Sequence, residues 1–165
     1  MIHRVQIIEL PLLRLTVRGE YALRALTHLG LRYSAGVIQI PAISAAENIP
    51  KRFLEQILNQ LRNGGFVESR RGVSGGYRLA KLPQEISLAA IIRHTEGALA
   101  PIGCVSENFY EKCNCPDELR CALRSVMREV RDSIAQKLEA TTLADLVVRA
   151  KKLAVIKDIE TDFII

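Results

Sequence analysis

The stretch that decides the fold runs from residue 51 to residue 79 and reads KRFLEQILNQLRNGGFVESRRGVSGGYRL. Its first half predicts an amphipathic helix over 51–63, because apolar residues recur there at helical spacing until two glycines end the pattern. The apolar positions are Phe53, Leu54, Ile57, Leu58 and Leu61. Its second half predicts a β-hairpin, because two short strand-like pieces, 66–69 and 77–79, flank a basic connection rich in turn residues.

The segment before residue 51 predicts two more helices. The first begins at Thr16, a good N-cap, and ends near Gly36, which suits a left-handed cap. Its buried stripe is predicted to comprise Val17, Tyr21, Ala25 and Leu29. A short helix then fits 41–47, and residues 48–50 form a tight turn. Two helices joined by such a turn and followed by a hairpin indicate a winged helix-turn-helix, with a plain surface hairpin as the alternative for the wing.

Charge is distributed unevenly along the 165 residues. The segment 14–81 holds 11 Lys and Arg against 4 Asp and Glu, whereas the segment 82–165 holds 11 against 13. A basic half joined to a neutral half suggests a polyanion-binding domain attached to a second element, although a solvated basic face without a ligand is the alternative. No apolar run approaches the ~20 residues that span a bilayer, and the segment 7–13 makes a poor signal peptide. We therefore expect a cytoplasmic protein that makes no membrane contact.

The candidate DNA-binding residues fall in the helix 51–63 and in the wing. Glu55 can accept a hydrogen bond from cytosine and Gln56 can pair with adenine. Lys51, Arg52 and Arg62 would hold phosphates. For Glu55 the alternative is an ordinary surface position. Arg71 is expected to enter the minor groove, because the glycines beside it let the backbone approach closely, and Arg70 or Arg78 could share that role. The full candidate set is Lys51, Arg52, Glu55, Gln56, Arg70, Arg71, Gly72, Ser74 and Gly75.

The second half of the chain predicts three helices around an irregular segment. A helix over 87–95 is followed by the segment 97–119, and a long helix then fits 121–138. The apolar stripe of that long helix comprises Leu123, Val126, Met127, Val130, Ile134 and Leu138. The stripe is either intramolecular core or a dimer seam, and the seam is favoured because the preceding domain looks complete. Thr142 and Asp145 resemble a capping box that opens a last helix to about Leu153, followed by a tail.

Four cysteines, Cys104, Cys113, Cys115 and Cys121, lie within 18 residues. Because the cytoplasm keeps thiols reduced, we expect these cysteines to have a role other than forming a disulfide framework. A closed zinc site is one alternative, although Cys-x-Cys is not the usual zinc-knuckle spacing. A thiol redox protein or small electron carrier is another, although the segment holds no Cys-x-x-Cys and an electron carrier has no need of a basic helix-turn-helix.

Five stretches together resemble the IscR/NsrR/RirA family of bacterial winged helix-turn-helix regulators over residues 13–153. They are 14–16, 19–22, 53–58, 71–79 and 142–146. The resemblance implies a mostly α protein that is not an enzyme. It would be a homodimeric transcriptional repressor that binds double-stranded DNA. Its operator affinity would be controlled by an iron–sulfur cluster that senses iron, redox state or nitric oxide. The implied organisation is an extension of unknown role (1–13), the winged helix-turn-helix (14–96), the cluster loop (97–120), the dimerisation and final helices (121–153) and a tail (154–165).

The resemblance also implies a set of cluster ligands. These are Cys104, Cys115 and Cys121, with Cys113 as an alternative to Cys115, around a 2Fe–2S or a 4Fe–4S cluster. Arg124 stands where IscR-like members carry a ligating histidine, so the fourth ligand would be Cys113 or Glu20 of the other subunit. Glu20 stands where NsrR-like members carry a ligating carboxylate. A cluster-less or zinc-stabilised regulator of the same fold is the alternative.

Overall fold

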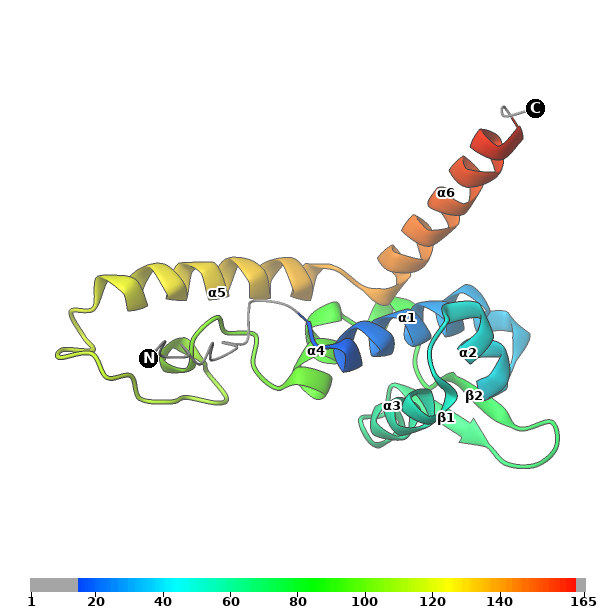
Figure 1. The fold of residues 1–165 in the computed structure, drawn as a ribbon, viewed down its shortest axis with the longest axis horizontal. Coiled ribbons are helices and arrows are strands. Elements are labelled where there is room, and N and C mark those ends of the chain that lie inside the picture. Colours follow the sequence, from blue (N-terminus) through cyan, green and yellow to red (C-terminus); the bar gives the residue numbers. More distant parts are fainter. Residues whose placement is uncertain (1–14, 163–165) are drawn as a thin grey trace, which may run out of the picture.

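The computed structural model describes the backbone of residues 15–162 and the side chains of residues 15–155. The predicted extension 1–13 therefore lies outside the described residues. The order of elements is α1 (Val17–Leu31), α2 (Ile40–Glu47), α3 (Lys51–Asn63), β1 (Val67–Arg70), β2 (Gly76–Leu79), α4 (Leu88–Glu96), α5 (Ala122–Ala140) and α6 (Leu143–Asp162). Single 3-10 turns lie at 33–35, 83–85 and 103–105. The mostly helical winged fold predicted from the sequence is confirmed (Figure 1).

Helix α1 lies at the centre of the winged head, where it contacts α2, α3, α4 and β2. Its buried face is carried by Ala22, Ala25, Leu26 and Leu29. The predicted stripe needs correction, because Val17 is 59% exposed. A strict i, i+4 repeat drifts around a helix of 3.6 residues per turn, so its two ends cannot share one buried face. The core is closed by residues that are almost fully buried, among them Ile43, Leu54, Leu58, Leu61 and Ile91.

The last helix completes the head, although the chain between 97 and 140 leaves it. The backbone N–H of Leu143 donates to Ile86 O (2.8 Å), the N–H of Leu88 donates to Thr141 O (2.9 Å), and the Leu143 side chain is fully buried. Helix α6 also packs against α1. The predicted boundary at residue 96 is therefore corrected, because the head takes part of its core from 141–147. The predicted tail is corrected as well: residues 154–162 continue α6, since no Gly or Pro interrupts the sequence there.

The predicted capping box opens α6. The backbone N–H of Asp145 donates to Thr142 Oγ1 (3.3 Å), and the N–H of Thr142 donates to Asp145 Oδ2 (2.8 Å). These hydrogen bonds from Thr142 hold the pKa of Asp145 below its ordinary value. Each side chain thus satisfies a backbone donor that the helix start leaves unpaired.

We expect Thr142→Ala to lower the free energy of unfolding by ~1 kcal/mol, because the cap is lost. Since folding lowers the pKa of Asp145, its stabilisation is present above the unfolded pKa and lost as pH falls through the folded pKa. Asp145→Asn should therefore destabilise the protein at pH 7 and match the wild type below the folded pKa. Urea unfolding between pH 7 and a pH below the folded pKa of Asp145 measures both effects. Glu129→Gln, which neutralises an exposed carboxylate on α5, is the control, and an equal loss in that variant would contradict the capping argument.

The two ends of the molecule differ in architecture (Figure 1). The hairpin and α3 lie at one end of the head. Helix α5 and the irregular segment before it extend together from the opposite end, and the C-terminal part of α6 projects beyond its contact with α1. Within the described residues, no helix has the length and apolar character needed to cross a membrane.

Candidate nucleic-acid interface and metal centre

A groove runs between the start of α2, the exposed face of α3 and the hairpin. Its lining includes six of the nine predicted DNA-binding residues: Lys51, Glu55, Arg70, Arg71, Gly72 and Gly75. The other three, Arg52, Gln56 and Ser74, are exposed but do not line it. Arg62 adds a further cation, so four cations face one carboxylate in the groove. Such a surface suits a polyanion.

The hairpin wing needs its glycines. Strands β1 and β2 pair antiparallel with Val67 opposite Leu79, and Tyr77 also pairs with Ile38 through two backbone hydrogen bonds of 2.8 and 2.9 Å. A Cβ on Gly76 would come within 2.5 Å of Ile38 O, and Gly72 has a φ of +108° that suits only glycine. The wing is thus a compact loop fixed to the head at its base.

Gln39 is a groove residue that the sequence reasoning missed. Its Nε2 donates to Val73 O (3.1 Å), so the residue before α2 holds the tip of the wing. The only feature of the sequence that could have indicated this role is that Gln39 directly precedes α2, which begins with Ile40 and Pro41. Arg78 differs from Arg71, because it pairs with Glu68 and is not among the residues that line the groove.

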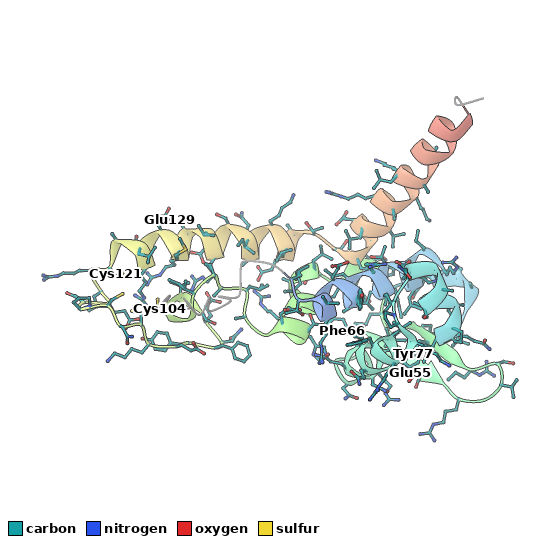
Figure 2. All side chains as sticks on the ribbon, in the orientation of Figure 1. Glu55, Phe66, Tyr77, Cys104, Cys121 and Glu129 are labelled. Carbon is teal, nitrogen blue, oxygen red and sulfur yellow. The ribbon has the colours of Figure 1, made fainter. Side chains whose placement is uncertain are left out.

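Polar contacts that the sequence did not predict hold the C-terminal end of α3 and join α1 to α2. At the C-terminal end of α3, Gln60 Nε2 donates to His94 O (3.1 Å), and His94 Nε2 donates to Gln60 O (2.8 Å). The ring of Phe66 lies 5.3 Å from the ring of His94 (Figure 2). Before α3, the buried His28 contacts Glu47 Oε1 through Nδ1 (3.0 Å) and so joins α1 to the end of α2. The helix-turn-helix is thereby fixed against α1 and α4.

All four cysteines line one pocket of about 250 Å³ between the irregular segment and the start of α5. Cys104 is buried and the other three are half-buried. The Sγ atoms of Cys115 and Cys121 are 3.5 Å apart. Cys121 is the N-cap of α5, and its Sγ accepts from the N–H of Arg124 (3.4 Å). The predicted ligands are therefore neighbours in space.

The thiols perturb one another. Burial and a hydrogen bond with Cys113 raise the pKa of Cys104, and hydrogen bonds with Cys113 and Cys121 raise the pKa of Cys115 to about 12. The pKa of Cys113 is lowered by its hydrogen bonds with Cys115. Several thiolates at once would repel each other, so a positively charged occupant would favour their deprotonation.

The donor chemistry of this pocket fits an iron–sulfur cluster. Four cysteine sulfurs are the soft donors that such clusters use, and zinc accepts them too. Among the described residues no three Cys, His, Asp or Glu side chains already surround the position of a single ion. Glu20 is not among the described residues that line the pocket of its own chain; it is exposed and pairs with Arg24 (3.3 Å). Its predicted role in a partner subunit stays a prediction.

Two arginines of α5 hold the first cysteine in place. Arg124 Nε donates to Cys104 O (3.1 Å), and Arg131 Nη1 donates to Val105 O (2.7 Å). Arg124 also pairs with Glu118 (3.2 Å). From the sequence, Arg124 is notable only because it stands where IscR-like members carry a ligating histidine. Its spacing of seven from Arg131, two helical turns, is the signal that would have revealed a common face.

The two candidate sites lie at opposite ends of the molecule. In Figure 2, Glu55 and Tyr77 mark the groove, and Cys104 and Cys121 mark the cysteine pocket across the length of the structure. Helix α4, which contacts both α3 and α5, lies between the elements that form the two sites.

Comparisons with known proteins match most of the chain. Residues 15–149 match the Rrf2 family model, described as an iron-dependent transcriptional regulator. The transcriptional regulator NsrR of Geobacillus kaustophilus is 37% identical over 134 residues, which cover 81% of this chain and 89% of NsrR. The structure of CymR, titled the global cysteine regulator of B. subtilis, superposes with a TM-score of 0.70 at 30% identity and covers 82% of this chain and 97% of that one. The structure of T. potens IscR superposes with a TM-score of 0.68 at 28% identity, over 85% and 90%.

Proposed function

Because the chain belongs to the Rrf2 family of DNA-binding transcriptional regulators, we propose that it is a homodimeric repressor whose operator affinity depends on an iron–sulfur cluster bound by its cysteine pocket. The observation that carries the proposal is that four cysteine thiols line one pocket in a chain with a basic winged head. Its place of action is the cytoplasm, where it meets DNA. The family and the relatives are those of transcriptional regulators rather than of enzymes.

The groove supports DNA binding through two kinds of contact. Helix α3 buries Leu54, Ile57, Leu58 and Leu61 and leaves its other face to the solvent, as a helix must to enter the major groove. On that face Glu55 would read a base edge, and Lys51 at the helix start would contact a phosphate. The wing would place Arg71 in the adjacent minor groove.

The cysteine pocket would hold the cluster through Cys104, Cys115 and Cys121. When bound, the cluster would supply an iron centre that reacts with oxygen or nitric oxide and whose charge depends on redox state. The protein contributes the positioning of the ligands: Arg124 and Arg131 hold the backbone of Cys104 and Val105, and the first turn of α5 holds Cys121. The fourth ligand would be Cys113 of the same chain or Glu20 of the partner.

Helix α4 offers a route from the pocket to the DNA. It directly precedes the cysteine segment, and its Arg93 pairs with Glu139 of α5 (2.5 Å). The next residue, His94, exchanges two hydrogen bonds with Gln60 near the end of α3. A change in the cysteine segment that moves α4 would therefore move the recognition helix. The same change acting on α5 would alter the angle between the two heads of a dimer.

The dimer is proposed to form on α5. In the single chain this helix of 19 residues has no buried residue, and Leu123 and Val126 are 59% and 52% exposed. Leu138 already packs against the core of the head. The exposed part of the stripe around Leu123 and Val126 needs a covering surface, because a long helix gains most of its stability from burying its apolar face. A second copy of the same helix, related by a two-fold axis, offers a self-complementary one. Two heads would then meet successive major grooves on a near-palindromic site.

We expect Val126→Glu to weaken dimerisation by on the order of 3 kcal/mol, because it places an unpaired carboxylate in the seam. Gln136→Glu is the matched control, since it adds the same charge at an exposed position of α5 away from the apolar stripe. Sedimentation equilibrium or light scattering across micromolar concentrations measures the dissociation constant. A wild-type protein that stays monomeric, or an equal effect of the two variants, would show that the stripe is not the seam.

The proposed function is tested on anaerobically purified protein. We expect iron and sulfide, a brown colour, and an operator mobility shift that changes after exposure to nitric oxide or oxygen. Gln60→Ala should retain the iron but reduce the difference in DNA affinity between the cluster-bound and cluster-free forms.

The similarity to CymR favours one other candidate, a regulator of the same fold without a cluster. Stoichiometric zinc or no metal, with DNA binding insensitive to both gases, would establish that alternative.

A further inference from the structure

We propose that Cys115 and Cys121 are a modification site: in the metal-free protein, peroxide converts them to an intramolecular disulfide. The two Sγ atoms are 3.5 Å apart in a chain whose thiols are all free. Both side chains are half-buried and line a pocket that is open to the solvent, so a small oxidant can reach them. Only a small movement separates this contact from a covalent bond.

Contacts within the loop hold the backbone between these two cysteines in a fixed turn. Asp117 Oδ1 accepts from the N–H of Leu119 (3.0 Å) and from the N–H of Arg120 (3.2 Å), which forms a tight turn between the two thiols. Pro116 directly after Cys115 restricts the backbone further. At the other end, Cys121 Sγ accepts from the N–H of Arg124 and is therefore held at the start of α5. Contacts of the chain thus hold both ends of the pair.

The reaction balances with hydrogen peroxide as the two-electron oxidant. The Cys121 thiol attacks peroxide, the O–O bond breaks, one water leaves, and Cys121 becomes a sulfenic acid. The Cys115 thiol then attacks that sulfur, the S–S bond forms, and a second water leaves. Two thiols are oxidised and one peroxide is reduced to two waters.

Pairs that include Cys104, and the pair Cys113 and Cys115, are less suited to this bond. Cys104 is only 5% exposed, and its backbone is held to α5 by Arg124. Cys113 and Cys115 are separated by one residue, so a disulfide between them would close a small ring far from the preferred disulfide geometry. Cys115 and Cys121 are both partly exposed, and their sulfur atoms are in contact.

The consequence rests on the proposed function. The disulfide uses two of the three predicted cluster ligands, so an oxidised apo-protein would not regain a cluster when iron and sulfide return. It would first need reduction by a dithiol. Oxidative loss of the cluster would then persist after the oxidant has gone, until thiol reductants recover.

The test treats full-length, metal-free protein with equimolar hydrogen peroxide, alkylates the remaining thiols and digests with trypsin. Cleavage after Lys112, Arg120 and Arg124 separates Cys121 from Cys115, and places Cys104 in a third peptide. We expect two thiols to become protected from alkylation and a dithiothreitol-sensitive link to form between the peptides 113–120 and 121–124. Iron uptake on reconstitution should be lost until dithiothreitol is added.

Two variants assign the link, because Cys113 and Cys115 share one tryptic peptide. Cys113→Ser should keep the link to 121–124, and Cys115→Ser should lose it. A link that survives in Cys115→Ser, a link to the peptide that carries Cys104, or four thiols that all remain alkylatable would overturn the proposal. The peptide readout needs no iron: a protein that forms this link but never binds a cluster would refute the proposed function alone, and one that binds a cluster but forms no link would refute this inference alone.

Discussion

Anaerobically reconstituted protein is expected to lose its iron and its brown colour when Cys104, Cys115 or Cys121 is replaced by Ser. The physical reason is that serine cannot replace the soft thiolate donor, although it nearly matches cysteine in size. At Cys121 the replacement is especially informative, because serine is a good N-cap and keeps an acceptor for the N–H of Arg124. Loss of iron in Cys121→Ser would therefore report a lost ligand rather than a lost helix start.

Iron and sulfide content, visible absorbance and far-ultraviolet circular dichroism together separate these outcomes. Cys113→Ser is the internal control for ligand assignment: full iron in this variant leaves Glu20 of the partner as the fourth ligand, and Glu20→Gln should then give a cluster that oxygen destroys faster. Complete iron binding by Cys104→Ser or Cys121→Ser would contradict the proposed ligand set. Stoichiometric zinc in place of iron would make the pocket a structural site.

Arg71→Ala is expected to weaken operator binding by about 1–3 kcal/mol, because it removes the proposed minor-groove contact of the wing. Lys51→Ala should act differently: it removes a phosphate contact, so affinity should fall about equally on operator and random DNA, and the salt slope should fall by ~1. Arg78→Ala is the matched control, since Arg78 lies in the same hairpin but pairs with Glu68 away from Arg71.

Fluorescence anisotropy on an operator selected from a random DNA pool, at several salt concentrations, measures these effects. Equal operator affinities for wild type and Arg71→Ala would show that the wing does not enter the groove. A loss in Arg78→Ala as large as that in Arg71→Ala would show that the hairpin is destabilised as a whole, rather than that one contact is missing.

Local features of the fold were predicted well from the sequence. The bounds of α3, residues 51–63, agree with the prediction, because an amphipathic repeat and two glycines specify them. The capping box of Thr142 and Asp145 also formed as predicted. Helical periodicity, caps and turn residues act between neighbours a few positions apart, so the physics that sets them is present in a short window of sequence.

The sequence by itself therefore determined the winged helix-turn-helix, its basic character and the gathering of four cysteines before a long amphipathic helix. Only the tertiary structure decided which residues share each site. Gln39 holds Val73 of the wing, Leu143 completes the core of the head, and Arg124 holds the backbone of Cys104. Partners of this kind are separated by 20 residues or more. They meet because whole helices pack face to face, and the geometry of that packing is set by the combined burial of many apolar side chains rather than by any local pattern.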